Sequence, residues 1–154
     1  MTTFTSREVV RDTLYTLFNA YTGSGQPLQT VFNNWPKTGE AKGLSPILMI
    51  TSAGTSQSFE TLSVNPTAYR IRLTSLVIAG QKNDTNVTRA AAMDKLDQLD
   101  TLVRQVIRDN VSSNAWNNIN FEGGFSEPET ILFEGLPYMV ESHIVIARLN
   151  KGAI

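Results

Sequence analysis

Apolar residues recur along the chain with two different periods, and the period assigns each segment to a helix or to a strand. The first segment has helical spacing, with apolar positions at Val10, Leu14, Leu17, Phe18 and Tyr21. This spacing predicts a helix from Thr5 to Tyr21 with one apolar face. Thr5 and Glu8 match a capping box, in which the hydroxyl accepts a hydrogen bond from a first-turn amide and the carboxylate reaches back.

A longer helical pattern in the middle of the chain predicts a helix from Val87 to Asp109. Its apolar positions recur every three or four residues, at Leu96, Leu99, Leu102, Val103, Val106 and Ile107. Charged residues occupy much of the remaining surface, and Arg104 and Arg108 near the end complement the helix dipole. Asn110 follows as a suitable C-terminal cap.

Five other segments are typical of strands. Leu44–Ala53 contains four consecutive apolar residues, a pattern typical of a strand that is covered on both faces. Tyr69–Ala79 alternates apolar and polar residues, so one face is predicted to lie in the core. The last third of the chain adds three strands, within Ala115–Gly124, within Glu129–Gly135 and along Pro137–Leu149.

Two long segments between these elements are predicted mostly as loops. Gly23–Gly43 is compatible with a short strand around Leu28–Phe32, and its Trp35 is expected to fold back onto the core. Ala53–Pro66 is small and polar, and it indicates a flexible loop or a hairpin tip. Loops of this length are uncommon in compact domains and are often functional.

These elements predict an α+β fold in the order α-β-β-α-β-β-β. We expect one mostly antiparallel sheet of about five strands, with two helices packed on one face. The chain has 154 residues, which suits a single domain over residues 1–154.

Composition narrows the classes of function. Thirteen basic and fourteen acidic residues nearly cancel and form no blocks, which argues against a nucleic-acid backbone as the main partner. The chain has no cysteine, so thiol catalysis and cysteine metal sites are excluded. The N-terminus does not resemble a signal peptide, and no apolar run approaches the roughly 20 residues that cross a bilayer. We therefore expect no membrane partner.

The single histidine, His143, lies on the final predicted strand. Alternation places it on the same face as Glu141, where a weak pair can form. Catalysis would require a nucleophile and a third group that orients the histidine, and the chain has no G-x-S-x-G elbow. The sequence "GFSEP" around Ser126 is a turn. We therefore interpret His143 as a half-exposed strand residue and predict that the protein is not an enzyme.

No motif indicates a cofactor or a metal. Asp94, Asp97 and Asp100 share one side of the second helix at spacings that could gather a hard cation. Because Lys95 and Arg104 lie beside them, we interpret them as a solvated helix face. The chain has no Walker loop and no dinucleotide-binding glycine motif after a strand.

The final strand instead indicates self-assembly. It is apolar or weakly polar on both faces over about ten residues, and the helices are expected to cover only one of them. An uncovered apolar sheet face promotes aggregation, so we expect sister chains to cover it. Head-to-tail contacts that close on themselves produce rings.

The order and length of these elements resemble those of the tail terminator (tail completion) proteins of long-tailed bacteriophages. The resemblance covers nearly the full chain. It is carried by the segments "REVVRDTLYTLFNA", "GLSPILMITSA", "YRIRLTSLVIAG", "RAAAMDKLDQLDTLVRQVIRDN" and "ETILFEGLPYMVESHIVIARL".

The resemblance implies a structural virion protein that acts by binding. Six copies would form a ring that caps the tail tube at its head-proximal end, stops its polymerisation and provides a docking surface for the head. The implied partners are sister chains, the tail-tube protein and the head-completion or connector protein, with the tape-measure protein as a further candidate. DNA would pass through the channel without sequence-specific contacts. Assembly would take place in the host cytoplasm.

The resemblance also suggests contact residues. These are Trp35, Phe59 and the turn from Phe121 to Phe125, with Arg70 and Arg72 facing either a neighbouring subunit or the channel. Plain solvation of the two arginines is the alternative. Three other functions remain open: a head–tail connector of the neck, a tail-tube subunit and a small cytoplasmic binding module. Tube proteins generally need more strands and fewer helices than this sequence predicts.

Overall fold

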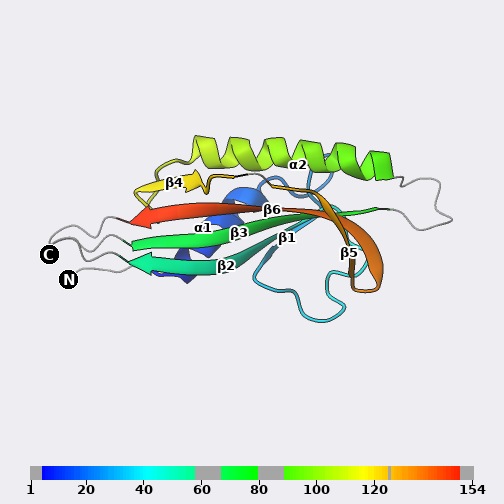
Figure 1. The fold of residues 1–154 in the computed structure, drawn as a ribbon, viewed down its shortest axis with the longest axis horizontal. Coiled ribbons are helices and arrows are strands. Elements are labelled where there is room, and N and C mark those ends of the chain that lie inside the picture. The colour runs from blue at the N-terminus through cyan, green and yellow to red at the C-terminus, as the bar shows by residue number, and fades with distance from the viewer. Residues whose placement is uncertain (1–4, 58–66, 80–88, 125, 150–154) are drawn as a thin grey trace, which may run out of the picture.

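The computed structural model describes residues 5–57, 67–79, 89–124 and 126–149. Two helices and one six-stranded, mostly antiparallel sheet form an α+β fold, as predicted (Figure 1). The elements in chain order are α1 (Arg7–Asn19), β1 (Thr30–Asn33), β2 (Ile47–Gln57), β3 (Thr67–Ile78), α2 (Arg89–Asp109), β4 (Asn118–Phe121), β5 (Glu129–Phe133) and β6 (Leu136–Leu149).

The long strand β6 organises the sheet. The strand order is β1-β2-β3-β6-β4, with β5 also paired to β6. One edge of β6 pairs with β3 along almost its whole length, and the other edge pairs with β5 near its start and with β4 near its end. Among the strands that the structure describes, β1 and β2 form the one parallel pair. The sixth strand is β1, which overlaps the segment around Leu28–Phe32 that the sequence left open.

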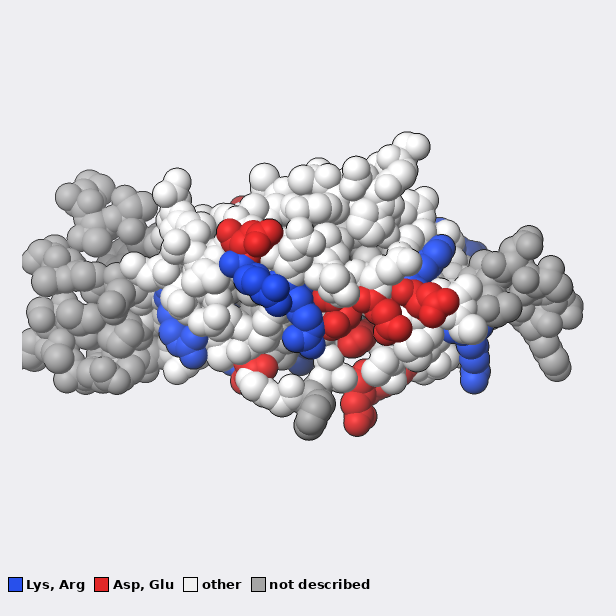
Figure 2. Space-filling view, turned by 90° about the horizontal axis from the view of Figure 1, so that it is seen from above, with Lys and Arg blue, Asp and Glu red and all other residues white. Residues whose placement is uncertain are grey.

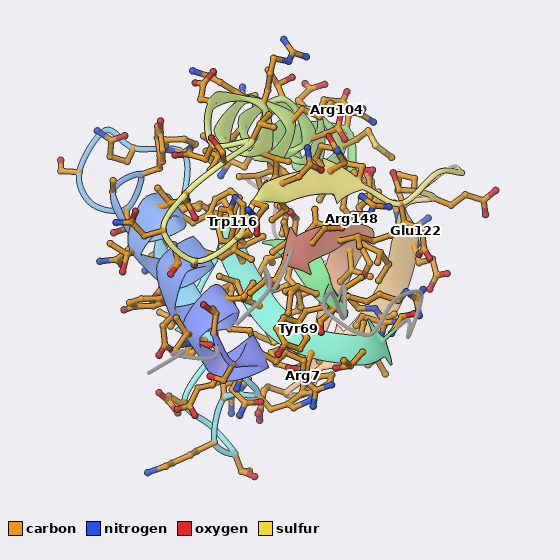
Figure 3. All side chains as sticks on the ribbon, turned by 90° about the vertical axis from the view of Figure 1, so that its left-hand side faces the viewer. Arg7, Tyr69, Arg104, Trp116, Glu122 and Arg148 are labelled. Atoms are coloured by element: carbon orange, nitrogen blue, oxygen red, sulfur yellow. The ribbon has the colours of Figure 1, made fainter. Side chains whose placement is uncertain are left out.

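Both helices pack on the same face of the sheet, as predicted. Val10, Leu14 and Phe18 of α1 share one core cluster with the apolar stripe of α2. Viewed along the strands (Figure 3), Trp116 lies between the helices, and its indole nitrogen donates to the Asn110 carbonyl at 2.9 Å. Complete burial of a leucine-sized side chain contributes roughly 2 kcal/mol, so this face supplies most of the stability.

The ends of the helices differ in part from the sequence analysis. The N-cap of α1 is Ser6, whose hydroxyl accepts from the Val9 amide at 3.2 Å, so the prediction of Thr5 as the cap was wrong. The Thr5 carbonyl instead accepts from the Tyr69 hydroxyl. Asn110 does cap α2, because its side-chain amide donates to the Val106 carbonyl at 2.8 Å.

The sheet face opposite the helices, the second sheet face, is covered at one end by the chain itself. Ala41, Ile47, Met49, Leu76, Tyr138 and Val140 form a second buried cluster there. The segment 34–46 and the β5–β6 hairpin lie over this end, and Figure 1 shows both below the sheet. The four consecutive apolar residues of β2 are therefore buried on both faces, as predicted. Sister chains are not needed to cover this part of the sheet.

The prediction of a flexible loop or a hairpin tip over Ala53–Pro66 was wrong for the first residues of that segment. Strand β2 continues to Gln57 and pairs with β3 across a register shift between Ser52 and Gly54. A β-bulge of this kind bends a strand without ending its pairing. The remaining residues of that segment lie outside the described part of the chain.

Candidate functional site

The other end of the second sheet face is open. On β3 and β6, Arg72, Ser142 and Arg148 are exposed, whereas Arg70, Thr74, Ile144 and Ile146 are half-buried. The register places Arg70 beside Ile146 and Arg72 beside Ile144. This open face therefore combines two partly exposed isoleucines with three cations.

Arg70 already has a partner within its own chain. Its guanidinium donates to Glu122 at 2.7 Å, and both side chains remain partly exposed. The hydrogen bond to Glu122 and its negative charge raise the pKa of Arg70. Arg72 forms no ion pair with any residue that the structure describes. Of the two arginines, Arg72 is the one available to another chain.

Trp35 is 68% exposed, so the expectation that it folds back onto the core was wrong. Strand β1 ends just before it, and Asn34 turns the chain with φ of 97°. The Asn34 side-chain oxygen accepts from the Trp35 amide at 2.9 Å and supports this turn. The indole is thus held away from the core by a defined local structure.

The sequence analysis missed a second apolar contact point. Leu132 of β5 is 78% exposed and Ile131 is 36% exposed. The hairpin belongs to the same end of the sheet as the segment that carries Trp35, because Phe133 and Leu136 pack on the same cluster as Ala41. Leu132 looked like an ordinary strand residue, since alternation alone does not reveal that β5 has only one neighbouring strand.

Phe121, the first residue of the predicted Phe121–Phe125 turn, packs within its own chain. Phe121 is half-buried on the helical side of the sheet. Its ring meets the His143 ring edge-on at 5.8 Å between centroids, and the Arg104 guanidinium lies 5.7 Å from its centre. The contact between Phe121 and a partner chain stays a prediction. Phe59 and Phe125 lie outside the described residues.

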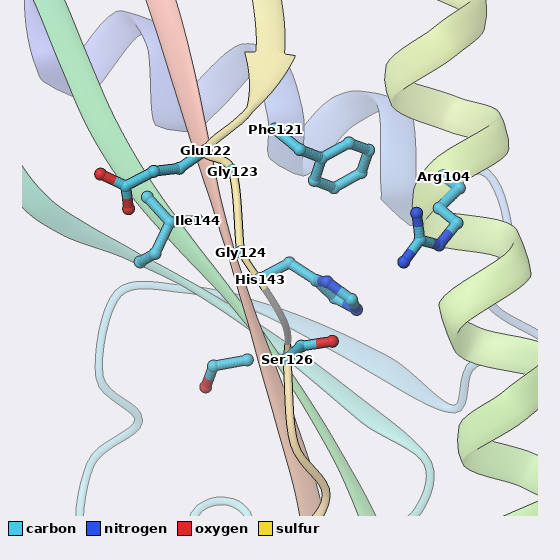
Figure 4. Close-up of a pocket in the computed structure, with 9 residues that line it drawn as sticks. Arg104, Phe121, Glu122, Gly123, Gly124, Ser126, His143 and Ile144 are labelled. Carbon is cyan, nitrogen blue, oxygen red and sulfur yellow. The ribbon is translucent and has the colours of Figure 1, made fainter.

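His143 is buried rather than half-exposed, because α2 packs over its strand. It is 7% exposed, and its Nε2 lies 3.1 Å from Asp100 of α2 and 3.9 Å from Glu141. Figure 4 shows the imidazole pointing toward α2, whereas Ile144 and Glu122 point away from it. The expected pairing with Glu141 is thus present, and Asp100 joins it.

The three aspartates of α2 do not behave alike. Asp94 and Asp97 are exposed, as expected for a solvated helix face. The Asp100 side chain is only 29% exposed, and Arg104 donates to its Oδ2 at 3.0 Å. The other oxygen, Oδ1, is buried and accepts no hydrogen bond from the described residues. This unsatisfied atom is the one nearest to His143.

A pocket of about 270 Å³ opens beside this cluster (Figure 4), lined among others by Arg104, Phe121, Ser126 and His143. Burial lowers the pKa of His143, and the carboxylates of Glu141 and Asp100 only partly offset this shift. The Ser126 hydroxyl donates to Glu141 at 3.0 Å and not to the imidazole. The hydrogen bond by which a histidine activates a serine nucleophile is therefore not formed here.

The face that carries α2 shows no field of a single charge over the described residues. Figure 2 shows acidic and basic side chains interspersed over the face that carries α2, in line with a formal net charge of −1. Among the helices that the structure describes, none is long and apolar enough to span a membrane. Neither the comparison with protein-family models nor the comparison with curated proteins finds a match to this chain.

Proposed function

We propose that this protein is a phage tail terminator, whose copies form a ring that caps the tail tube and presents a surface to the head. The observation that carries this proposal is the pair of exposed apolar side chains, Trp35 and Leu132, on the two segments that cover one end of the second sheet face. The element order and its resemblance to terminator proteins supply the rest.

The two halves of the second sheet face suit a head-to-tail contact. A ring requires that each copy present two different and complementary surfaces. The end that is covered by the segment 34–46 and the β5–β6 hairpin, the protruding end, presents Trp35 and Leu132. The open end presents Ile144 and Ile146 beside arginines. An indole can pack on aliphatic side chains and attract a guanidinium over its ring. We propose that the protruding end of one copy contacts the open face of the next.

The exposed indole is large enough to matter for such a contact. With 68% of its surface exposed, burial would remove roughly 170 Å² from water, which corresponds to at most about 4 kcal/mol per contact. Tryptophans that lie at the centre of an interface commonly contribute more than about 2 kcal/mol. Truncating this side chain should therefore weaken ring formation without weakening the fold.

Negative-stain imaging of the purified protein, alone and mixed with tail tubes, tests the proposal. We expect rings or caps at one tube end with the wild type. The Trp35→Ala variant should fail to cap tubes, whereas Val9→Ala, which truncates an exposed residue of α1, should still cap them. Because terminators can be monomeric in solution, capping of tubes is the deciding measurement.

The alternative functions predict different results in the same imaging experiment. Long polymers of the purified protein would indicate a tail-tube subunit, and binding to the head connector without tube capping would indicate a neck component. If neither tubes nor connectors bind the wild type, the chain is a binding module of another kind. Equal capping by Trp35→Ala and Val9→Ala would exclude the contact proposed above.

A further inference from the structure

We infer that Asp100, Glu141 and His143 form a binding site for a divalent transition-metal ion such as Zn²⁺, which would tie helix α2 to strand β6. One ligand atom from each residue lies within 4.8 Å of the other two. The site belongs to a single copy of the chain and does not depend on ring assembly.

The spacing of the donor atoms fits a shared ion. Zinc lies about 2.0 to 2.2 Å from imidazole nitrogen and carboxylate oxygen, which places neighbouring donor atoms of a tetrahedral site about 3.3 to 3.6 Å apart. The distance from His143 Nε2 to Asp100 Oδ1 is 3.1 Å. The distance from His143 Nε2 to Glu141 Oε2 is 3.9 Å, which rotation of the glutamate side chain can shorten.

The buried polar atoms of this cluster include one that lacks a hydrogen-bond partner among the described residues. The His143 side chain is 6% exposed, and its Nε2 faces Asp100 Oδ1 at 3.1 Å. Asp100 Oδ1 is buried and accepts no hydrogen bond from the described residues. A buried acceptor without a partner costs about 1 to 3 kcal/mol. An ion between this oxygen and the imidazole nitrogen would remove that cost.

The surrounding groups orient the proposed ligands. Arg104 donates to Asp100 Oδ2 and leaves Oδ1 facing the histidine, and Ser126 donates to Glu141 Oε2. Outer partners of this kind hold metal-ligating carboxylates in place. Arg104 also brings a positive charge, but two carboxylates outweigh it and leave the cluster at about −1 with a neutral imidazole. The adjoining pocket leaves room for water in the remaining coordination positions.

The donor set also indicates which ion is preferred. Imidazole nitrogen suits zinc and other first-row transition metals, whereas magnesium and calcium prefer oxygen ligands alone. We therefore expect zinc to bind and magnesium at the same concentration not to bind. Cobalt, which often replaces zinc, provides a coloured probe of the same site.

The test uses full-length, untagged protein from which metals have been removed by chelator dialysis. Zinc chloride is titrated by calorimetry and by nuclear magnetic resonance of the histidine ring, which gives one set of signals because the chain has one histidine. We expect one zinc ion per chain and a shift of the imidazole signals. With zinc at about 100 times its dissociation constant, the unfolding midpoint should rise by about 5 to 10 °C.

Matched variants separate this site from adventitious binding. Asp100→Asn keeps the shape of the side chain and should weaken zinc binding more than tenfold, whereas Asp97→Asn on the exposed side of α2 should leave it unchanged. Ser126→Ala should weaken binding by about tenfold through loss of the outer contact. Unfolding of each metal-free variant checks that its fold is intact.

Two results would overturn the inference. One is the absence of any zinc-dependent heat or imidazole shift in the wild type. The other is equal zinc affinity of Asp100→Asn and Asp97→Asn, which would show that zinc binds elsewhere. Neither result bears on tube capping by the ring, so failure of this inference leaves the proposed function untouched.

Discussion

Removal of a single buried hydroxyl offers a quantitative test of how the second sheet face is covered. Tyr138 is fully buried, and its hydroxyl donates to the Leu44 carbonyl at 2.8 Å. This bond joins β6 to the segment 34–46, which carries Trp35. The variant Tyr138→Phe keeps the ring and its edge-on contact with Phe133 but leaves the carbonyl without its donor.

The expected loss of stability is about 1 to 2 kcal/mol, the usual cost of removing one partner of a buried hydrogen bond. For a chain of this length that corresponds to a fall in the unfolding midpoint of about 2 to 8 °C. Urea unfolding measures the free energy, and an unchanged slope with urea shows that the fold is otherwise intact. Tyr15→Phe is the matched control, because the Tyr15 hydroxyl makes no hydrogen bond to the described residues.

The same variant has a defined pH dependence. Burial raises the pKa of Tyr138, and the charge of Glu134 adds to this shift, while a backbone hydrogen bond at Gly43 opposes it. A raised folded-state pKa contributes stability that is fully present below the unfolded value of about 10 and is lost as the pH rises through the folded value. Wild type should therefore lose stability above about pH 10 more steeply than Tyr138→Phe does.

Two outcomes would refute this account of the covered face. One is a stability of Tyr138→Phe within about 0.5 kcal/mol of wild type, which would mean that the hydroxyl does not hold the segment 34–46. The other is an identical alkaline slope for the two proteins, which would mean that the hydroxyl is not sequestered from water in the folded state.

Three other changes test the packing described above. Leu99→Ala at the 1%-exposed centre of α2 should cost about 2 to 5 kcal/mol in urea unfolding, because it leaves a cavity. Ser6→Ala should lower the free energy of unfolding by about 1 kcal/mol through loss of the α1 cap, and Thr5→Ala should lower it clearly less. A larger loss for Thr5→Ala than for Ser6→Ala would show that Thr5 is the cap. Glu122→Gln should change the free energy of unfolding only slightly, because its pair with Arg70 is partly exposed, and high salt should reduce the difference from wild type.

The candidate site was only partly predictable from the sequence. Strict alternation along β6 placed His143 on the face of Glu141, and the 3.9 Å between His143 Nε2 and Glu141 Oε2 agrees with that placement. Alternation could not reveal Asp100, which lies 43 positions earlier and reaches the histidine only because α2 packs across β6. The same packing buries the imidazole, which by strand position alone looked half-exposed.

The exposed residues were also only partly predictable from the sequence. The sequence singled out Trp35, but it could not tell an indole that folds inward from one that is held outward, because the choice depends on the turn at Asn34. Leu132 was missed because its exposure follows from a missing neighbour strand, and that is a property of the whole sheet. For Arg70 the sequence left a neighbouring subunit, the channel and plain solvation open, and it could not reveal that Glu122 reaches the guanidinium within the chain.

The sequence by itself determined the two helices, most of the strands and the α+β class. The helical and strand periods are local patterns in the sequence. They are enough to predict which side of a helix or strand is buried. Only the tertiary structure decided that β1 joins the sheet, that the segment 34–46 covers one end of the second face and that Asp100 meets His143. These contacts join residues far apart in the chain, so their free energy depends on packing that no local pattern contains.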